Sequence, residues 1–428
     1  MARYDLGMKS ASTLLEPIFV KLERLFGWNR NYLYGVLNGW FVSMGDGFFN
    51  QSIVLSSFAA TLGASNSVIG ALPAITVGGW LLPQLLVASK IRHLPRKIVV
   101  YQKTALARTA SMIFIVLSSA VFAGNHTLLL VMFLLGLLIN ALASGVGGLP
   151  WFEVAAKTIP AADRSRFFGI RNLWGGLLAL LAGFLVKAIL ASSLVFPFDY
   201  TLIFALGALV FTFGWNVYGL TDEPPDPPQN PSRFRDEIKA IPSTVMSDPG
   251  FKAYVMYRVA TALATLADPF FTVYALRVIG LPKVSIGNFL IVVGIVAPFS
   301  NWVWSVVASN FGSRRIIRYA LGFSIAALLT ALLMPKGAGN WYALVFVLSG
   351  VAQAGLNLGN ANHILGVARA EARGRYIGTV NTLVGIAVFM PVLGGKLADI
   401  FNYQVVFVIG ALAYLGAWFL AGKLRRDL

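Results

Sequence analysis

The sequence contains no cysteine, and charged residues are scarce in it. Without cysteine the chain can form no disulfide, thiolate metal site, iron–sulfur cluster or thiol nucleophile. The three histidines, His93, His126 and His363, lie too far apart for metal-ligand spacing. The phosphate-binding pattern GxxxxGK[ST] is missing, so the sequence gives no sign of ATP-driven chemistry. We therefore expect no metal site, no cofactor and no enzymatic activity.

Hydrophobic residues are what the chain has in abundance. They make up 57% of its 428 residues, whereas charged residues make up 12%, a composition that indicates an integral membrane protein. A bilayer core needs about 20 apolar residues per helix, and every backbone polar group there must be paired internally. This length predicts twelve transmembrane helices, over Leu33–Leu62, Val68–Ala88, Ile98–Phe122, Leu128–Ala156, Phe167–Ala191, Thr201–Leu220, Tyr254–Val278, Val284–Ala308, Ile316–Met334, Tyr342–Val367, Tyr376–Ile400 and Gln404–Gly422.

Lysines and arginines number 34 against 17 acidic residues, and they gather in every second gap between the predicted spans. This distribution favours membrane topology over nucleic-acid binding, and it places both termini and the central loop in the cytoplasm. We expect a multi-pass protein of a prokaryotic plasma (inner) membrane, present as a monomer. The basic loops hold Arg96 and Lys97, Arg164 and Arg166, Arg314 and Arg315, and Arg373 and Arg375.

The chain divides into four predicted segments. Residues 1–30 form an N-terminal segment in which Thr13–Trp28 has the pattern of an interfacial amphipathic helix. Residues 31–220 and 251–428 each hold six spans. Residues 221–250 form a cytoplasmic linker that starts with prolines and is therefore predicted to be extended there.

Two short runs in these halves resemble each other. Asp46 begins Asp-Gly-Phe-Phe, Asp268 begins Asp-Pro-Phe-Phe 222 positions later, and both runs lie midway along long apolar segments. The same offset pairs further positions that share a helical face with the two aspartates. A stripe of this kind should turn away from lipid. The further pairs are Gly39 with Thr261, Ser43 with Thr265, and Asn50 with Thr272.

A second internal repeat precedes the fifth and eleventh spans. Arg164-Ser-Arg-Phe-Phe-Gly-Ile-Arg-Asn172 aligns with Arg373-Gly-Arg-Tyr-Ile-Gly-Thr-Val-Asn381 at an offset of 209. The two repeats indicate halves of common origin. We expect an all-α membrane protein with two pseudo-symmetric six-helix bundles, a known transporter plan.

The twelve spans, the like-oriented halves, the central loop and the basic second and eighth gaps resemble the major facilitator superfamily. The loop motif of that family has the form Gly-x-x-x-Asp-Arg-x-Gly-Arg-Arg. The matching stretches here are Arg92-His-Leu-Pro-Arg-Lys97 and Ser309-Asn-Phe-Gly-Ser-Arg314-Arg315, and both lack the aspartate.

The resemblance implies that the first, fourth, seventh and tenth spans line a central cavity. It therefore places both aspartate stripes in the transport pathway, together with amides and hydroxyls that can bind a solute which has shed its water. The implied cavity residues are Ser43, Asn50, Asn140, Ser144, Trp151, Tyr257, Thr261, Thr265, Thr272, Gln353, Asn357 and Asn360.

The two aspartates are the candidate coupling residues. Aspartate within a bilayer is opposed by roughly 2.5 to 3.5 kcal/mol, so it normally serves a function or has a partner. Asp46 is interpreted as a protonation or substrate-cation site, with a structural ion pair to Arg108 as the alternative. Asp268 has the same interpretation, but it could also simply accompany a kink at Pro269.

Two further charged positions have two interpretations each. Glu153 is predicted to pair with Lys157, four residues later on the same helix, or to act in a gate. Arg258, beside Tyr257, is either a cytoplasmic anchor or part of the inner gate.

We expect a secondary transporter that moves a small organic solute by alternating access, with protons as the coupling ion and the bilayer as its surroundings. Export of a cationic or neutral amphiphile is favoured. A lipid or lysolipid flippase of the same fold is the first alternative, because the spans are rich in aromatic residues. A non-transporting receptor or scaffold is the second.

Overall fold

The computed structural model describes residues 17, 19–91, 94–226, 241–246, 248–367 and 373–425, and these residues form helices and turns without any strand. Eleven helices in this part are long and apolar enough to cross a membrane. Of the twelve predicted spans, the first is not among these eleven helices, and its polar residues lower its mean hydropathy. The predicted all-α membrane fold with about twelve spans is therefore confirmed.

The first half contains the helices before the linker. Its first span is broken into three pieces, and its second has a wide turn of π-helix in the middle. The elements are α2 (Arg30–Phe48), η1 (Gln51–Leu55), α3 (Ser56–Thr61), α4 (Asn66–Pro73), η2 (Ala74–Gly78), α5 (Gly79–Ile91), α6 (Ile98–Val121), α7 (His126–Thr158), η3 (Ala161–Asp163), α8 (Arg164–Leu190) and α9 (Phe198–Tyr218).

The second half repeats this arrangement. Its first span is again broken, and two of its predicted spans are joined in α14. The elements are α11 (Ile241–Met246), α12 (Pro249–Ala264), η4 (Thr265–Ala267), α13 (Phe270–Tyr274), η5 (Ala275–Ile279), α14 (Ser285–Leu333), η6 (Gly339–Tyr342), α15 (Ala343–Val367), α16 (Arg373–Ala387), α17 (Met390–Ile400) and α18 (Tyr403–Ala421).

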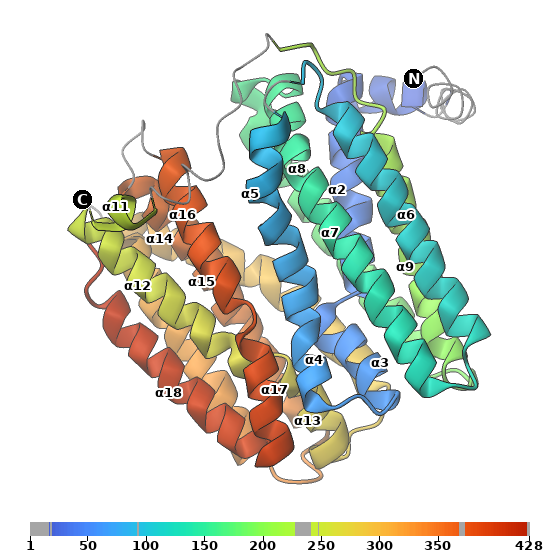
Figure 1. Cartoon of the computed structure of the whole chain (residues 1–428), viewed down its shortest axis with the longest axis vertical. Helices are drawn as coiled ribbons and strands as arrows, with labels where there is room; N and C mark the ends of the chain where they lie inside the picture. The colour runs from blue at the N-terminus through green and yellow to red at the C-terminus, as the bar shows by residue number, and fades with distance from the viewer. Residues whose placement is uncertain are drawn as a thin grey trace.

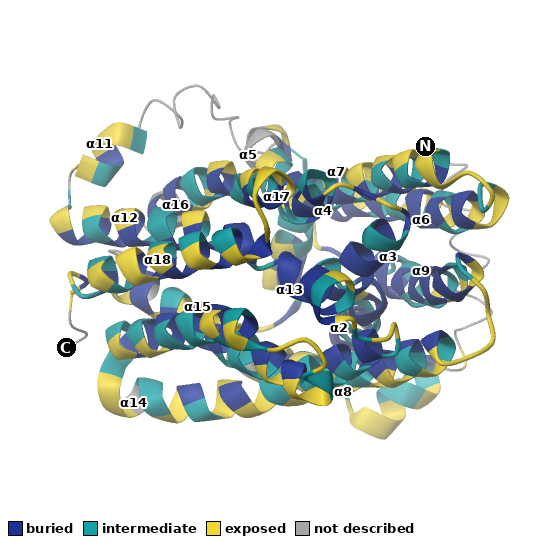
Figure 2. Cartoon of the chain, turned by 90° about the horizontal axis from the view of Figure 1, so that it is seen from below, coloured by how far each residue is buried: buried dark blue, intermediate teal, exposed yellow. Residues whose placement is uncertain are grey.

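The two halves lie side by side, with α4, α5 and α17 between them (Figure 1). Helix α4 packs against α17 and α8 packs against α14, so both contacts join the halves. We call the end that carries residues 94–97 and 221–226 the linker end, and the opposite end, with residues 62–65 and 400–403, the far end (Figure 1). Viewed from the far end, buried positions face the interior of each half and exposed ones face outward (Figure 2).

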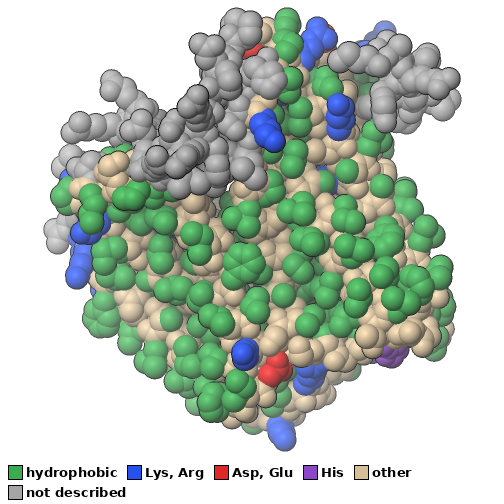
Figure 3. All heavy atoms as spheres, in the orientation of Figure 1, with side chains coloured by type: hydrophobic (Ala, Val, Ile, Leu, Met, Phe, Trp, Pro, Cys, Tyr) green, Lys and Arg blue, Asp and Glu red, His purple; other side chains and the backbone are tan. Residues whose placement is uncertain are grey.

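The outer surface is a broad apolar belt. Figure 3 shows hydrophobic side chains over most of the visible face, with lysine and arginine side chains toward the two ends. Large apolar residues such as Leu209, Phe299 and Phe419 are more than 60% exposed there. A soluble protein does not expose such a surface, so the belt faces lipid, and the chain is an integral multi-pass membrane protein.

Helix ends follow from local sequence. Asn29, Asn125 and Asn402 precede α2, α7 and α18, and each side-chain oxygen accepts a hydrogen bond from a backbone N–H of the first turn. Asp248 does the same for α12, whose first residue is Pro249. These caps satisfy amide groups that have no partner within the helix.

The first span of each half is interrupted at mid-depth. Helix α2 ends after Phe48, and Asn50 has extended ψ (116°) while its side chain accepts a hydrogen bond from the N–H of Ile53. In the second half, α12 gives way to the 3₁₀ turn η4, and Pro269 lies just before α13. Proline cannot donate the helical hydrogen bond, which accounts for this second break.

Three other predictions gain detail. The eighth and ninth predicted spans are two helices that follow each other directly within α14, and the chain turns between them at Gly312 (φ 76°). Residues 19–26 of the predicted interfacial helix are helical, and Phe19 packs on Tyr34 instead of facing outward; most of the preceding residues lie outside the described part. Residues 221–226 lack regular structure, as the prolines predict.

Candidate functional site

The first half encloses a pocket of about 400 Å³ beside the break in its first span. Asp46 and Asn50 line it from the first span, Asn140 and Ser144 from α7, and Arg108 from α6. Its walls are otherwise mostly apolar and aromatic. We call this the N-half pocket.

A larger pocket of about 570 Å³ lies beside the broken span of the second half. Asp268 lines this C-half pocket together with Arg258, Thr261 and Thr265 of the same span. Helix α15 contributes amide side chains, of which the Gln353 Nε2 donates to the Asn357 Oδ1 at 3.1 Å. The third amide, Asn360, also lines the pocket.

The two pockets meet at the break in the first span. Asn50, Gln51 and Val77 line both of them. The pockets of Asp46 and Asp268 are therefore neighbours at the broken first span. Discontinuous helices at mid-depth are where transporters of this general plan build their binding sites.

Asp46 does not form the ion pair that the sequence suggested. Its side chain is exposed to the N-half pocket, and no lysine or arginine nitrogen lies within 4.0 Å of its carboxylate among the described residues. Arg108 lines the same pocket but stacks on the ring of Trp215, with its guanidinium carbon 3.7 Å from the ring centre. The predicted Asp46–Arg108 pair is therefore wrong as a direct contact, because the tryptophan holds the guanidinium by a cation–π interaction.

Asp268 has a neutral partner. The Tyr414 hydroxyl lies 3.0 and 3.3 Å from its two carboxylate oxygens. Tyr414 comes from α18 and also lines the C-half pocket. The aspartate is therefore held by a donor from the last helix, and its position depends on more than the kink at Pro269.

The second half contains a counterpart of the Arg108–Trp215 stack. Arg318 of α14 lies over Trp418 of α18 at 3.9 Å. In both stacks the arginine Nε is buried and has no hydrogen-bond partner. The sequence contained this signal, since each arginine lies in the third span of its half and each tryptophan in the sixth. Arg318, unlike Arg108, does not line either pocket.

Four of the predicted cavity residues line neither the N-half pocket nor the C-half pocket. Ser43 contacts α8, where a Cβ built on Gly175 would lie 2.6 Å from its hydroxyl oxygen. The Trp151 Nε1 donates to the buried Asn38 side chain at 3.1 Å. Tyr257 is buried and donates to the Asn360 Oδ1 at 3.0 Å. Thr272 is buried at the contact between halves and donates to the carbonyl of Ser52 at 2.7 Å. The helical period placed these residues near the pathway, but close helix packing covers them.

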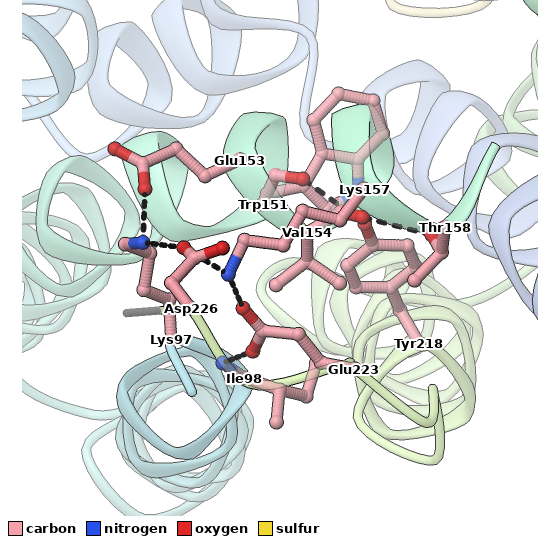
Figure 4. Close-up of polar contacts among 10 residues, drawn as sticks. All are labelled: Lys97, Ile98, Trp151, Glu153, Val154, Lys157, Thr158, Tyr218, Glu223 and Asp226. Carbon is pink, nitrogen blue, oxygen red and sulfur yellow. Dashed lines mark hydrogen bonds and ion pairs between the residues drawn. The ribbon is translucent and has the colours of Figure 1, made fainter. Parts of the chain in front are cut away.

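Glu153 belongs to a cluster of charges at the linker end (Figure 4). Its carboxylate pairs with Lys97 at 2.9 Å, so the predicted pair with Lys157 is wrong. Lys97 also binds Asp226 at 2.6 Å, and Lys157 pairs with both Glu223 and Asp226. We call these five residues the linker clasp, because two of its acids come from the start of the linker.

Burial and pairing shift the pKa values of Asp226 and Lys97 in the linker clasp. Hydrogen bonds from Lys157 and then Lys97 hold the pKa of Asp226 below its usual value. Burial alone would lower the pKa of Lys97, but hydrogen bonds to Asp226 and Glu153 outweigh it and raise that pKa. Both groups therefore stay charged over the physiological range.

Three of the other basic loop residues contact backbone carbonyls or an aromatic ring. Arg164 donates to the carbonyls of Ala156 and Ile159 at the end of α7, and Arg314 donates to the carbonyl of Gly422. Arg315 lies 5.2 Å from the ring centre of Phe311. Arg96 and Arg166 are exposed, whereas the side chains of Arg373 and Arg375 lie outside the described part.

Polar contacts between the halves gather at the far end. Asp399 accepts hydrogen bonds from the Asn66 N–H (3.0 Å), the Ser67 N–H (3.1 Å) and the Ser67 hydroxyl (2.9 Å) at the start of α4. Arg277 donates to the carbonyls of Ala60 (2.9 Å) and Ala64 (3.1 Å), around the end of α3. The second half thus caps two helix ends of the first, the end of α3 and the start of α4, which closes this end of the molecule.

Sequence reasoning missed several pocket residues. Gln51 lines both pockets, and its side-chain oxygen accepts a hydrogen bond from Thr76. Trp80 adds an aromatic wall to the N-half pocket, and Ser324 lies beside Tyr414 in the C-half pocket. Most of these residues belong to spans outside the four that the resemblance singled out, so only the three-dimensional packing reveals them.

Comparison with known proteins identifies the family. The Major Facilitator Superfamily profile matches residues 35–390. The solved nucleoside transporter NupG, in a mutant form, is 15% identical, with a TM-score of 0.70, and the match covers 92% of this chain and all of that one. A bacterial homologue of the iron transporter ferroportin, in an inward-facing state, is 15% identical with a TM-score of 0.68, over 92% and 98% of the two chains. The inward-open xylose transporter XylE from E. coli is 15% identical with a TM-score of 0.63, over 93% and 96% of the two chains.

Identities this low show the fold alone, and no curated protein matches the sequence at a significant level. The profile match spans most of the chain, which therefore belongs to the Major Facilitator Superfamily.

Proposed function

We propose that the protein is a secondary transporter that couples movement of a small organic solute to protons. The observation that carries this proposal is the pair of aspartates, Asp46 and Asp268, which line neighbouring pockets at the broken first span of each half. A carboxylate that can meet either solvent in turn can carry a proton across the membrane. A proton gradient supplies about 2.3 kcal/mol per charge for each 100 mV of potential.

The linker end is proposed to face the cytoplasm, because the basic loops lie there. The far-end contacts of Asp399 and Arg277 then close the outer side, so this conformation is the cytoplasm-facing one. Rocking of the halves around the pockets would open the far end in the alternate state. A prokaryotic inner membrane and a monomeric state remain part of the proposal.

Export is the proposed direction for a cationic or net-neutral solute. A proton and a cationic group of the solute compete for the same carboxylate at Asp46, since a protonated carboxyl no longer attracts a cation. Competition for one site produces exchange, in which an entering proton displaces the solute. Such a solute is a small amphiphile, because amides and hydroxyls line the pockets beside apolar and aromatic side chains.

The proposal predicts that Asp46→Asn abolishes proton-driven accumulation in proteoliposomes and leaves solute counterflow, which then needs a higher solute concentration because the charge that attracts the cationic group is gone. Asparagine keeps a hydrogen-bond acceptor for the solute but cannot take up the coupling proton. The labelled solute comes from a thermal-shift screen of amino acids, sugars, nucleosides, lipophilic cations and lysolipids, in which ligands raise the melting temperature.

Asp163→Asn is the matched control, because Asp163 is exposed at the linker end and far from both pockets. It should keep full accumulation. Unchanged accumulation in Asp46→Asn would remove Asp46 from the coupling site. Translocation of a fluorescent lipid, without uptake of any soluble compound, would instead favour a flippase.

A further inference from the structure

Arg108 offers its guanidinium to the N-half pocket without a hydrogen-bonding or ion-pairing partner among the described residues. The residue lines the pocket, makes no hydrogen bond and no ion pair within the described part of the chain, and lies with its face on Trp215. The Nε is buried, but the terminal nitrogens are absent from the buried unpaired atoms, so the pocket can reach them. Stacking thus fixes the guanidinium plane and leaves its donor edge free.

Asp46 supplies the opposite charge in the same pocket. It too lacks a direct ion pair among the described residues, and it reaches the pocket from α2, whereas Arg108 reaches it from α6. A solute that displaces water from this pocket removes hydration from both groups, which is costly unless each gains a partner. A purely cationic solute would leave the guanidinium without a partner, and a purely anionic solute would leave the carboxylate without one.

We propose that the transported solute is a zwitterion whose carboxylate binds Arg108 and whose ammonium group faces Asp46. A guanidinium edge matches a carboxylate with two parallel hydrogen bonds. The rest of the solute lies against Phe49, Trp80 and Phe211, so an apolar or aromatic side chain fits the pocket. This assignment rests on the proposed function, since it names the solute class of the same pocket.

Arg318 provides a matched control for the role of Arg108. It stacks on Trp418 at 3.9 Å, just as Arg108 stacks on Trp215 at 3.7 Å, and its Nε is likewise buried and unpaired. Arg108 lines the N-half pocket, whereas Arg318 lines neither the N-half nor the C-half pocket. Removing either arginine has a comparable structural cost, whereas only the removal of Arg108 affects the carboxylate of the solute.

The test is ligand-induced thermal stabilisation of the purified full chain in nanodiscs. The probes are phenylalanine and alanyl-phenylalanine, each compared with its C-terminal amide and its N-acetyl form, which lack one charge. The zwitterions should bind roughly tenfold to a hundredfold more tightly than their amides, the range expected of a charge-assisted hydrogen-bonded pair. Arg108→Gln should abolish this preference, and Arg318→Gln should retain it.

Arg108→Lys covers the case in which Arg108→Gln does not fold. Lysine keeps the charge but not the two-pronged geometry, so the preference for the zwitterion should shrink without vanishing. Equal stabilisation by amides and zwitterions, a preference that survives Arg108→Gln, or no stabilisation by any probe overturns the assignment. Binding needs no proton gradient, so this outcome is separate from the transport test of Asp46.

Discussion

Glu223 is a buried acid whose partners come from two helices. It is 1% exposed, it accepts a hydrogen bond from the Ile98 N–H at 2.7 Å, and it pairs with Lys157 of α7. The start of α6 is where an anion is most favourable, because backbone N–H groups without helical partners point there. A single linker residue therefore ties α6 to α7.

Glu223→Gln should lower the free energy of unfolding by about 1.5 kcal/mol, because it removes one of the two carboxylates that pair with Lys157 and makes the hydrogen bond from the Ile98 N–H a neutral one, while Asp226 still pairs with Lys157. Thermal denaturation in detergent measures the effect. Asp222→Asn is the neighbouring control, since the Asp222 side chain is exposed, and it should change stability by less than about 0.5 kcal/mol. Equal shifts for the two variants would show that the buried pair contributes nothing.

Sequence reasoning was weakest for the partners of individual charged side chains. The aspartates and amides of the pockets could be predicted, because a polar stripe on an apolar helix must avoid lipid. The partner of Glu153 could not, because helical spacing favoured Lys157 while Lys97 approaches from another helix. The same limit applies to Arg108, whose stacking partner Trp215 lies on α9.

Residues 221–226 act as a strap across the linker end of the first half. Besides the clasp contacts, the Asp226 N–H donates to the carbonyl of Pro95 at 2.9 Å. Asn31 and Asp222 exchange two further hydrogen bonds of 3.0 Å. The loop at residues 92–97 lacks the aspartate of the family motif. The strap supplies acids near this loop, so basic residues there are still neutralised.

The contact between Asp226 and Lys97 in the linker clasp should be insensitive to pH between about 5 and 9. Asp226 has a lowered pKa when folded, so its contribution is present above the unfolded value of about 3.9 and is lost as pH falls through the folded value. Lys97 has a raised pKa, so its contribution is present below about 10.4 and is lost as pH rises through the folded value. The mobility of a spin label at Asp222→Cys should therefore stay constant over that range and rise only outside it, below about pH 4 and at strongly alkaline pH. Loosening near pH 6 would contradict these assignments.

The breaks in α2 and α12 show which elements sequence can anticipate. Pro269 predicts an interruption in the seventh span, and the structure has one beside it. Nothing in the apolar pattern predicts the matching break at Asn50, where an asparagine side chain takes over a backbone hydrogen bond. Asparagine offers the backbone this alternative to a helix, but it does so only where tertiary packing allows it.

At the far end, close packing accompanies the polar contacts between halves. A Cβ on Gly70 of α4 would lie 2.0 Å from the Pro391 carbonyl oxygen of α17, so only glycine allows this approach. On α17, a Cβ on Gly395 would lie 2.2 Å from the Asn66 carbonyl oxygen. Asp399 and Arg277 are exposed, so each hydrogen bond there is weak and can break when the halves rock.

The number of spans and the family followed from sequence, because both depend on apolar length and internal repetition. The conformation did not, because the proposed alternating access requires one sequence to adopt both the open and the closed state of each end. Only contacts such as Asp399 with Ser67 show which end is closed. The assignment of the linker end to the cytoplasm stays a prediction from its basic loops.

Labelling of single cysteines in the two pockets tests alternating access most directly, since the natural chain has no cysteine. Ser144→Cys and Gln353→Cys place a thiol in the N-half and C-half pocket, and a membrane-impermeant maleimide is applied to either side of oriented vesicles. We expect labelling from the linker side only, and labelling from the far side once Asp399→Asn and Arg277→Gln are added. Labelling of the original single-cysteine chains at equal rates from both sides, or from neither side, would contradict a shared cavity with alternating access.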